Sequence, residues 1–240
     1  MIIQRADESV LFITQPDHAA LAEHIMRHWS AHGFTEHPRR EAILFAVREH
    51  DNGWIEEDRD THVGADGVPL DFTSVPPAIK HRIWPRAADR VGRDRRYEAA
   101  LIAQHALTVH AEQRTDAEWR SFFDRMTRIR GSLMAALPLV SRGRFLGDYR
   151  FVRIGDLLSL VFCNGWTEPH TLPDDRRTIL KGATLEISPD PFNGRRVPLR
   201  VAARRLPVRR YGSAAELRAA LETAAPEFLE GYATGPCQES

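Results

Sequence analysis

Apolar side chains recur at helical spacing through much of the first 165 residues, after a short apolar segment at 9–14 that predicts a strand. In the segment after residue 16 the apolar positions lie three and four residues apart, at Leu21, Ala22, Ile25, Met26 and Trp29. Pro16-Asp17 is typical of a helix start, and Gly33 of its end. Similar repeats predict helices over residues 38–51, 95–113, 116–137 and 149–163. The last segment is also compatible with the start of a strand, but we favour a helix.

Residues 56–92 interrupt this pattern. They contain three glycines and four prolines with little periodicity, and we interpret them as a long structured loop with one short helix. Loops of that length in a compact domain are usually functional or disordered.

The pattern of apolar and polar residues changes after Gly165. Residues 184–187 and 197–202 alternate apolar and polar side chains as half-buried strands do, and residues 189–194 between them are rich in turn formers. Ser213 and Glu216 form a capping-box pattern that opens a last helix, and the tail after Gly231 is expected to fray. The prediction is therefore a mainly α protein, with a helical domain over residues 1–165 and a small α+β extension over residues 166–240.

Composition narrows the functional classes. The chain has 240 residues, 42% of them hydrophobic, and 33 basic residues balance 33 acidic ones. A net charge of zero argues against a nucleic-acid protein that relies on bulk electrostatics. No apolar run approaches the length of a membrane span, and the first eight residues lack the layout of a signal peptide. Cys163 and Cys237 do not make a disulfide framework, so we expect a cytoplasmic protein.

The candidate chemistry lies in histidine and aspartate side chains on the apolar faces of four predicted helices. These residues are His18, His50 with the adjacent Asp51, His105 and Asp156. An unpaired carboxylate on a core-facing stripe costs several kcal/mol and needs a cation or several hydrogen bonds. A divalent metal held between the helices would satisfy all five side chains. A lone histidine on such a face is usually an ordinary core residue, so the hypothesis depends on the full set.

Imidazole and carboxylate ligands suit Mn, Fe, Co, Ni or Zn, and the set contains no thiolate of the kind typical of a closed structural zinc site. His24, His28 and His32 also repeat every four residues, but they lie off the apolar stripe and we interpret them as a solvated face.

Two resemblances follow from these residues. A histidine, then a His-Asp pair at a helix end, then a late aspartate resembles the HD-domain superfamily of metal-dependent phosphohydrolases. More closely, residues 14–22, residues 49–54 (Glu-His-Asp-Asn-Gly-Trp) and residues 156–163 resemble a bacterial family catalogued as domain of unknown function 3891, with a weaker match at residues 190–192.

The superfamily resemblance implies an HD-like multi-helix bundle that binds one or two divalent metals through His18, His50, Asp51 and Asp156. His105 and His110 are candidates for a second metal, but they are five residues apart and do not share a helix face, so we assign only His105 as a ligand. The chain departs from the common superfamily pattern at residues 52–54, where Asn-Gly-Trp stands in place of the frequent Ile-Gly-Lys. The chain therefore lacks the lysine of that pattern, and the resemblance does not indicate which residues would contact a phosphate.

The function expected from this site is hydrolysis of a phosphate ester of a small metabolite or nucleotide by metal-activated water. Asp51, Glu49 and Asp58 are the candidate catalytic residues, the last two as acceptors for the ligand histidines. Arg93, Arg95 and Arg96 are candidates for phosphate contact, although a solvated helix start is the simpler interpretation. Two alternatives stay open, namely a di-iron oxygenase and a non-catalytic ligand-binding module. We expect a small-molecule partner, no nucleic acid and no membrane, and the oligomeric state is not predicted.

Overall fold

A computed structural model describes residues 1–5 and 8–236, with the backbone alone at residues 140 and 141. Cys237 lies outside the described residues. The helices of the described chain are α1 (Gln15–Arg27), α2 (Arg40–Glu49), α3 (Ile55–Asp60), α4 (Pro77–Gly92), α5 (Arg96–Val109), α6 (Arg120–Ala135), α7 (Leu139–Asn164) and α8 (Ala214–Thr223). Short 3-10 turns are η1 (Ala31–Gly33), η2 (Asn52–Trp54), η3 (Ala111–Thr115) and η4 (Ala117–Trp119).

Within the described residues, seven strands form one mixed sheet. They are β1 (Ile2–Arg5), β2 (Ser9–Ile13), β3 (His170–Thr171), β4 (Arg177–Lys181), β5 (Thr184–Ser188), β6 (Val197–Pro207) and β7 (Pro226–Thr234). Their order is β1-β2-β6-β7-β5-β4-β3, and β5 with β7 is the parallel pair. The long strand β6 lies between β2, near the N-terminus, and β7, near the C-terminus. Ser9 of β2 lies opposite Pro207 of β6.

The mainly α fold class is therefore wrong, and so is the HD-like bundle with a minor addition. About 53% of the chain is helix and 19% is strand, which makes the protein α/β. The error arises at both termini, where β1 was not predicted and β7 covers residues expected to fray. The division at residue 165 stays a prediction, and the sheet draws strands from both ranges.

Several local predictions are confirmed. In α1 the Thr14 hydroxyl accepts a hydrogen bond from the backbone N–H of Asp17, and Pro16 lies in the first turn. The segment with two possible assignments is helical and belongs to α7, which begins ten residues earlier than expected. Ser213 caps α8 by accepting from the backbone N–H of Glu216, while the Glu216 carboxylate accepts from the backbone N–H of Gly212 and not from that of Ser213.

The long loop at residues 56–92 is wrong in its second half, which forms the 16-residue helix α4. Pro77 lies in its first turn, where a missing N–H costs nothing. Ile79, Ile83, Ala87 and Val91 repeat every four residues and are buried. Pro85 interrupts the backbone hydrogen bonds without ending the helix, because this apolar face packs on α5 and α6.

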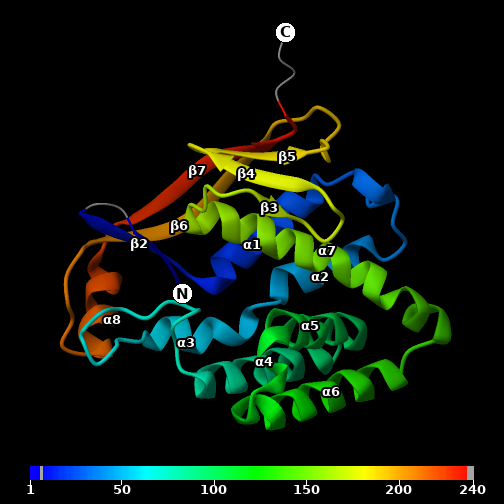
Figure 1. Ribbon diagram of the computed structural model, residues 1–240, viewed down its shortest axis with the longest axis horizontal. Coiled ribbons are helices and arrows are strands. Elements are labelled where there is room, and N and C mark those ends of the chain that lie inside the picture. The colour runs from blue at the N-terminus through cyan, green and yellow to red at the C-terminus, as the bar shows by residue number, and fades with distance from the viewer. Residues whose placement is uncertain (6–7, 237–240) are drawn as a thin grey trace.

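The fold places a helical layer against one face of the sheet. Figure 1 shows α1, α2 and α7 beneath the strands, α4, α5 and α6 farther from the sheet, and α8 at one end of it. One apolar core joins the sheet to α1, α2 and α7, and a second joins α4, α5 and α6. The candidate residues lie on α1, α2, α5 and α7, where these two cores adjoin. Across residues 1–5 and 8–236, no helix is both long and apolar enough to cross a lipid bilayer.

Candidate metal centre

Five polar side chains from four helices meet in the interior. They are His18 of α1, His50 and Asp51 at the end of α2, His105 of α5 and Asp156 of α7, each at most 6% exposed. Two groups of three have ligand atoms close enough to hold an ion, and His50 belongs to both. The first also contains His18 and Asp51, and the second His105 and Asp156.

The ligand atoms face one another across short distances. His18 Nε2 lies 2.9 Å from Asp51 Oδ2, and His50 Nε2 lies 3.6 Å from the same oxygen. His50 Nε2 is 3.4 Å from Asp156 Oδ1, and His105 Nε2 is 3.6 Å from Asp156 Oδ2. Ligands about 2.1 Å from one ion lie roughly 3.0 to 3.4 Å apart in octahedral or tetrahedral geometry, and the four spacings fall within about 0.2 Å of that range.

Hydrogen bonds on the outer side of the cluster determine which ring nitrogens carry protons. His50 Nδ1 lies 2.6 Å from the Val47 carbonyl oxygen, which can only accept, so this nitrogen carries a proton and donates it. Ser159 donates its hydroxyl proton to the carbonyl of Asp156 and therefore accepts from His18 Nδ1 at 2.8 Å. When these two imidazoles are neutral, each Nε2 carries a lone pair that faces carboxylate oxygen.

Two facing acceptors repel unless a cation or a proton lies between them. His50 Nε2 is buried and makes no hydrogen bond. This donor set therefore fits a divalent metal, whose ligand histidines usually donate their second nitrogen to a neighbouring acceptor. Without a metal, a proton on an imidazole would have to take that place.

The pKa directions reflect this crowding of charge. Burial would lower the pKa of His50, but the carboxylates of Asp51 and Asp156 outweigh burial and raise it to about 9. Burial lowers the pKa of His105 to about 3. Burial would raise the pKa of Asp156, but His105, His50 and Arg153 together hold it well below its usual range.

Three residues that support the cluster were not among those predicted from the sequence. Arg153 donates to Asp156 Oδ2 at 2.6 Å, Ser159 bonds His18, and the Tyr149 hydroxyl lies 3.2 Å from His105 Nδ1. Arg153 and Ser159 flank Asp156 three residues away on either side. That spacing places them on the same helix face, so it is the signal that could have identified them.

A cavity of about 370 Å³ opens directly beside the cluster. Asp51, His105, Arg153 and Asp156 form its charged wall. The rest of its lining includes aromatic and polar side chains at Trp54, Phe72, Trp84, Lys80, His110 and Gln113. A small molecule in this cavity would contact both the cluster and two cationic groups.

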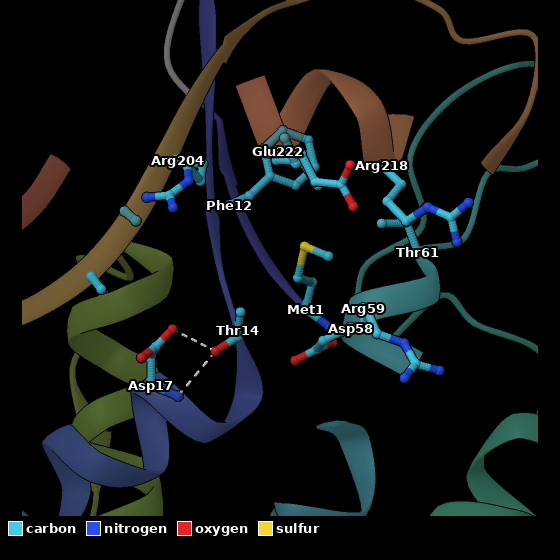
Figure 2. Close-up of a pocket in the computed structure, with 13 residues that line it drawn as sticks. Met1, Phe12, Thr14, Asp17, Asp58, Arg59, Thr61, Arg204, Arg218 and Glu222 are labelled. Carbon is cyan, nitrogen blue, oxygen red and sulfur yellow. Dashed lines mark hydrogen bonds and ion pairs between the residues drawn. The ribbon is translucent and has the colours of Figure 1, made fainter. Parts of the chain in front are cut away.

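Glu49 and Asp58 lie outside the five-residue cluster. Glu49, half-buried at the end of α2, accepts a hydrogen bond from the side chain of Asn52 at 3.2 Å. Asp58 is buried, and its two oxygens accept from the Met1 ammonium group and from the backbone N–H of Gln15. Figure 2 shows Asp58 and Met1 in a second hollow, of about 300 Å³, which is lined partly by α8. Neither carboxylate is placed to accept from a cluster histidine.

The turn after His50-Asp51 is held by helix α4. Arg86 donates to the Gly53 carbonyl at 3.1 Å, and Arg90 donates to the Asn52 carbonyl at 2.5 Å. A side chain on Gly53 would collide with the backbone of Ile83, so only glycine allows this close approach. The Asn-Gly-Trp sequence thus allows the turn to lie directly against α4.

The remaining candidates occupy other positions. His110 lines the cavity and accepts a hydrogen bond from the indole N–H of Trp84 at 2.9 Å. Arg95 pairs with Glu98 and lies over the ring of Phe45, so it does not point into the cavity.

Comparison with known proteins identifies one family. The family model described as "Protein of unknown function (DUF3891)" matches residues 1–208. Neither the curated proteins nor the solved structures include a significant match to the chain.

Proposed function

The chain belongs to the DUF3891 family, and we propose that it is a metal-dependent hydrolase acting on a phosphate ester of a small metabolite or nucleotide. The single observation that carries the proposal is that His18 Nε2 lies 2.9 Å from Asp51, while the buried His50 Nε2, which makes no hydrogen bond, lies 3.4 Å from Asp156. An arrangement of this kind is stable when a divalent cation completes it.

The proposed ligands are His18, His50, Asp51, His105 and Asp156, and they would hold one or two divalent ions. A bound ion of this kind lowers the pKa of its water and thereby supplies hydroxide at neutral pH. The order of His18, the His50-Asp51 pair and the late Asp156 is the order of the HD-domain ligands. We propose the same use of these positions here, independently of the overall fold.

The chain's own residues would select and orient the substrate. Arg153 has donors in addition to the one that binds Asp156, and Lys80 contributes a second positive charge to the cavity wall. Together they favour an anionic group next to the cluster. The aromatic rings of Trp54, Phe72 and Trp84 offer an apolar surface for the rest of the molecule.

Metal content is the direct test. The full chain is purified without an affinity tag, and its bound metals are measured by elemental analysis before and after reconstitution. We expect at least one Mn, Fe, Co, Ni or Zn per chain. We expect the loss of that metal in His50→Ala and in the near-isosteric Asp51→Asn, with His28→Ala as the matched control because His28 lies outside the cluster.

Activity is tested on the metal-loaded chain with p-nitrophenyl phosphate, bis(p-nitrophenyl) phosphate and a panel of nucleotides. Metal-dependent release of product that Asp51→Asn reduces at least about 100-fold would support the proposal. A chain that binds no metal after reconstitution would overturn it, as would unchanged metal content in both cluster variants. Two irons with an oxygen-dependent absorption band would favour the oxygenase instead.

A further inference from the structure

A row of arginines lies along one face of α4, away from the candidate metal centre. Arg82, Arg86 and Arg90 are four residues apart, and Arg93 follows at the end of the helix. Such spacing repeats along one helix face with a rise of about 6 Å per step. Helix α6 lies beside α4 (Figure 1), and Arg125 of α6 lines the same surface.

These side chains enclose a surface hollow of about 560 Å³. It is lined by Arg82, Arg86, Asp89, Arg90, Arg93 and Arg125. The only carboxylate in this lining is Asp89. The hollow shares no lining residue with the cavity beside the metal cluster, so the two are separate sites.

The positive charge of this surface exceeds what the chain itself neutralises. Glu57 pairs with Arg82 and Arg86, and Glu56 pairs with Arg86 and Arg90. The side chains of Arg93 and Arg125 make no ion pair or hydrogen bond with any residue in the described ranges 1–5 and 8–236. Five guanidinium groups are therefore balanced by three carboxylates, counting Asp89, which leaves two positive charges in excess. Asp60 also acts on Arg82, but it is itself paired with Arg59.

The spacing of the arginines along α4 indicates the size of the anion. One phosphate can engage about two guanidinium groups, whereas arginines whose backbone positions rise by about 6 Å per step along a helix suit a chain of phosphates. Guanidinium forks match phosphate oxygens in geometry and keep their charge at every physiological pH. We propose that the hollow between α4 and α6 binds a small polyphosphate, either free or as the triphosphate of a nucleotide.

The proposal is tested by calorimetric titration of the full chain with sodium tripolyphosphate at low salt. We expect a dissociation constant of about 0.1 mM that weakens as salt is added. Arg93→Ala combined with Arg125→Ala should weaken binding at least tenfold. Both side chains are exposed and lie away from the turn that carries Asp51, so this variant should fold normally.

Two further variants should not weaken the binding of tripolyphosphate. Asp89→Asn removes a negative charge from the hollow and should strengthen binding about threefold. His50→Ala should bind tripolyphosphate as the wild type does, which separates this site from the proposed metal centre. Arg200→Ala combined with Arg205→Ala, on the distant sheet, is the matched control for losing two surface arginines.

Titration with ATP and with a single-stranded oligonucleotide identifies the source of the phosphates. Tighter binding of ATP than of tripolyphosphate would point to a nucleotide, and equal binding to the free polyphosphate. No binding of tripolyphosphate at millimolar concentration would overturn the proposal, and so would unchanged binding in the Arg93 and Arg125 variant. An oligonucleotide that binds at least tenfold more tightly than tripolyphosphate would also overturn it, in favour of a nucleic-acid surface.

Discussion

Gly53 should be one of the least replaceable residues of the chain, although it carries no chemical group. It lies in the turn η2, two residues after Asp51. A Cβ atom added at Gly53 would lie 2.8 Å from the carbonyl carbon of Ile83, closer still to its oxygen, and 3.2 Å from the Cβ of Ala87. Observed Cβ contacts below 3.0 Å are essentially unknown, and here the opposing atoms are helix backbone, which cannot rotate away.

Gly53→Ala must therefore separate η2 from α4 by about 1 Å. A displacement of that size lengthens the hydrogen bonds that Arg86 and Arg90 donate to the Gly53 and Asn52 carbonyls. Overpacking of a rigid contact together with weakened charge-assisted hydrogen bonds should cost about 3 kcal/mol of unfolding free energy. The same displacement moves Asp51 relative to His18 and should weaken metal binding.

The measurement is the free energy of unfolding in urea, in the presence of a chelator so that metal does not contribute. Gly131→Ala is the matched control, because a Cβ atom at Gly131 meets nothing within 4 Å in α6. That control should gain about 0.5 to 1 kcal/mol from the lower entropy of its unfolded chain. A Gly53→Ala variant within about 0.5 kcal/mol of the wild type would refute the argument from close approach.

Three other predictions follow from single residues. Burial lowers the pKa of His110 to about 4. Between pH 6.5 and pH 4 this histidine is therefore protonated in the unfolded chain but neutral in the folded chain. The free energy of unfolding should fall by up to about 3 kcal/mol as the pH drops across that range. Urea unfolding of the wild type and of His110→Gln across that range should show the slope in the wild type and a shallower one in the variant. Ser159→Ala leaves the Nδ1 proton of His18 buried without an acceptor, and it should weaken metal binding about 10- to 100-fold in a competition assay with a chelating dye. Lys80→Ala should raise KM for an anionic substrate about tenfold with little change in kcat, and an unchanged KM would remove Lys80 from the substrate site.

Much of the helical layer follows from local patterns. The stripe at Leu21, Ile25 and Trp29 with Pro16 in the first turn predicts α1, because helical periodicity and capping act within a few residues. Helix α4 was missed because its prolines were interpreted as loop formers. Its buried apolar repeat at Ile79, Ile83 and Ala87 is equally visible in the sequence, and it outweighs the prolines in the folded chain.

The candidate site divides in a similar way. Placing His18, His50, His105 and Asp156 on apolar helix faces requires only the sequence, because each helix presents one stripe to the interior. Their distances from one another depend on how four helices pack, and no local pattern encodes that packing. Glu49 and Asp58 were selected for closeness in sequence, and the fold turns them toward Asn52 and toward Met1 and Gln15 instead.

The sheet shows most clearly what only the tertiary structure decided. Strand β2 is a visible apolar run, but its partner β6 lies almost two hundred residues later, and β7 beside it contains polar residues that resemble a fraying tail. Strand pairing between distant segments depends on the whole chain reaching its compact state, so short-range patterns cannot specify the strand order. By itself, the sequence determined which side chains turn inward along each helix. The packing of the helices on that sheet decided which of these side chains meet.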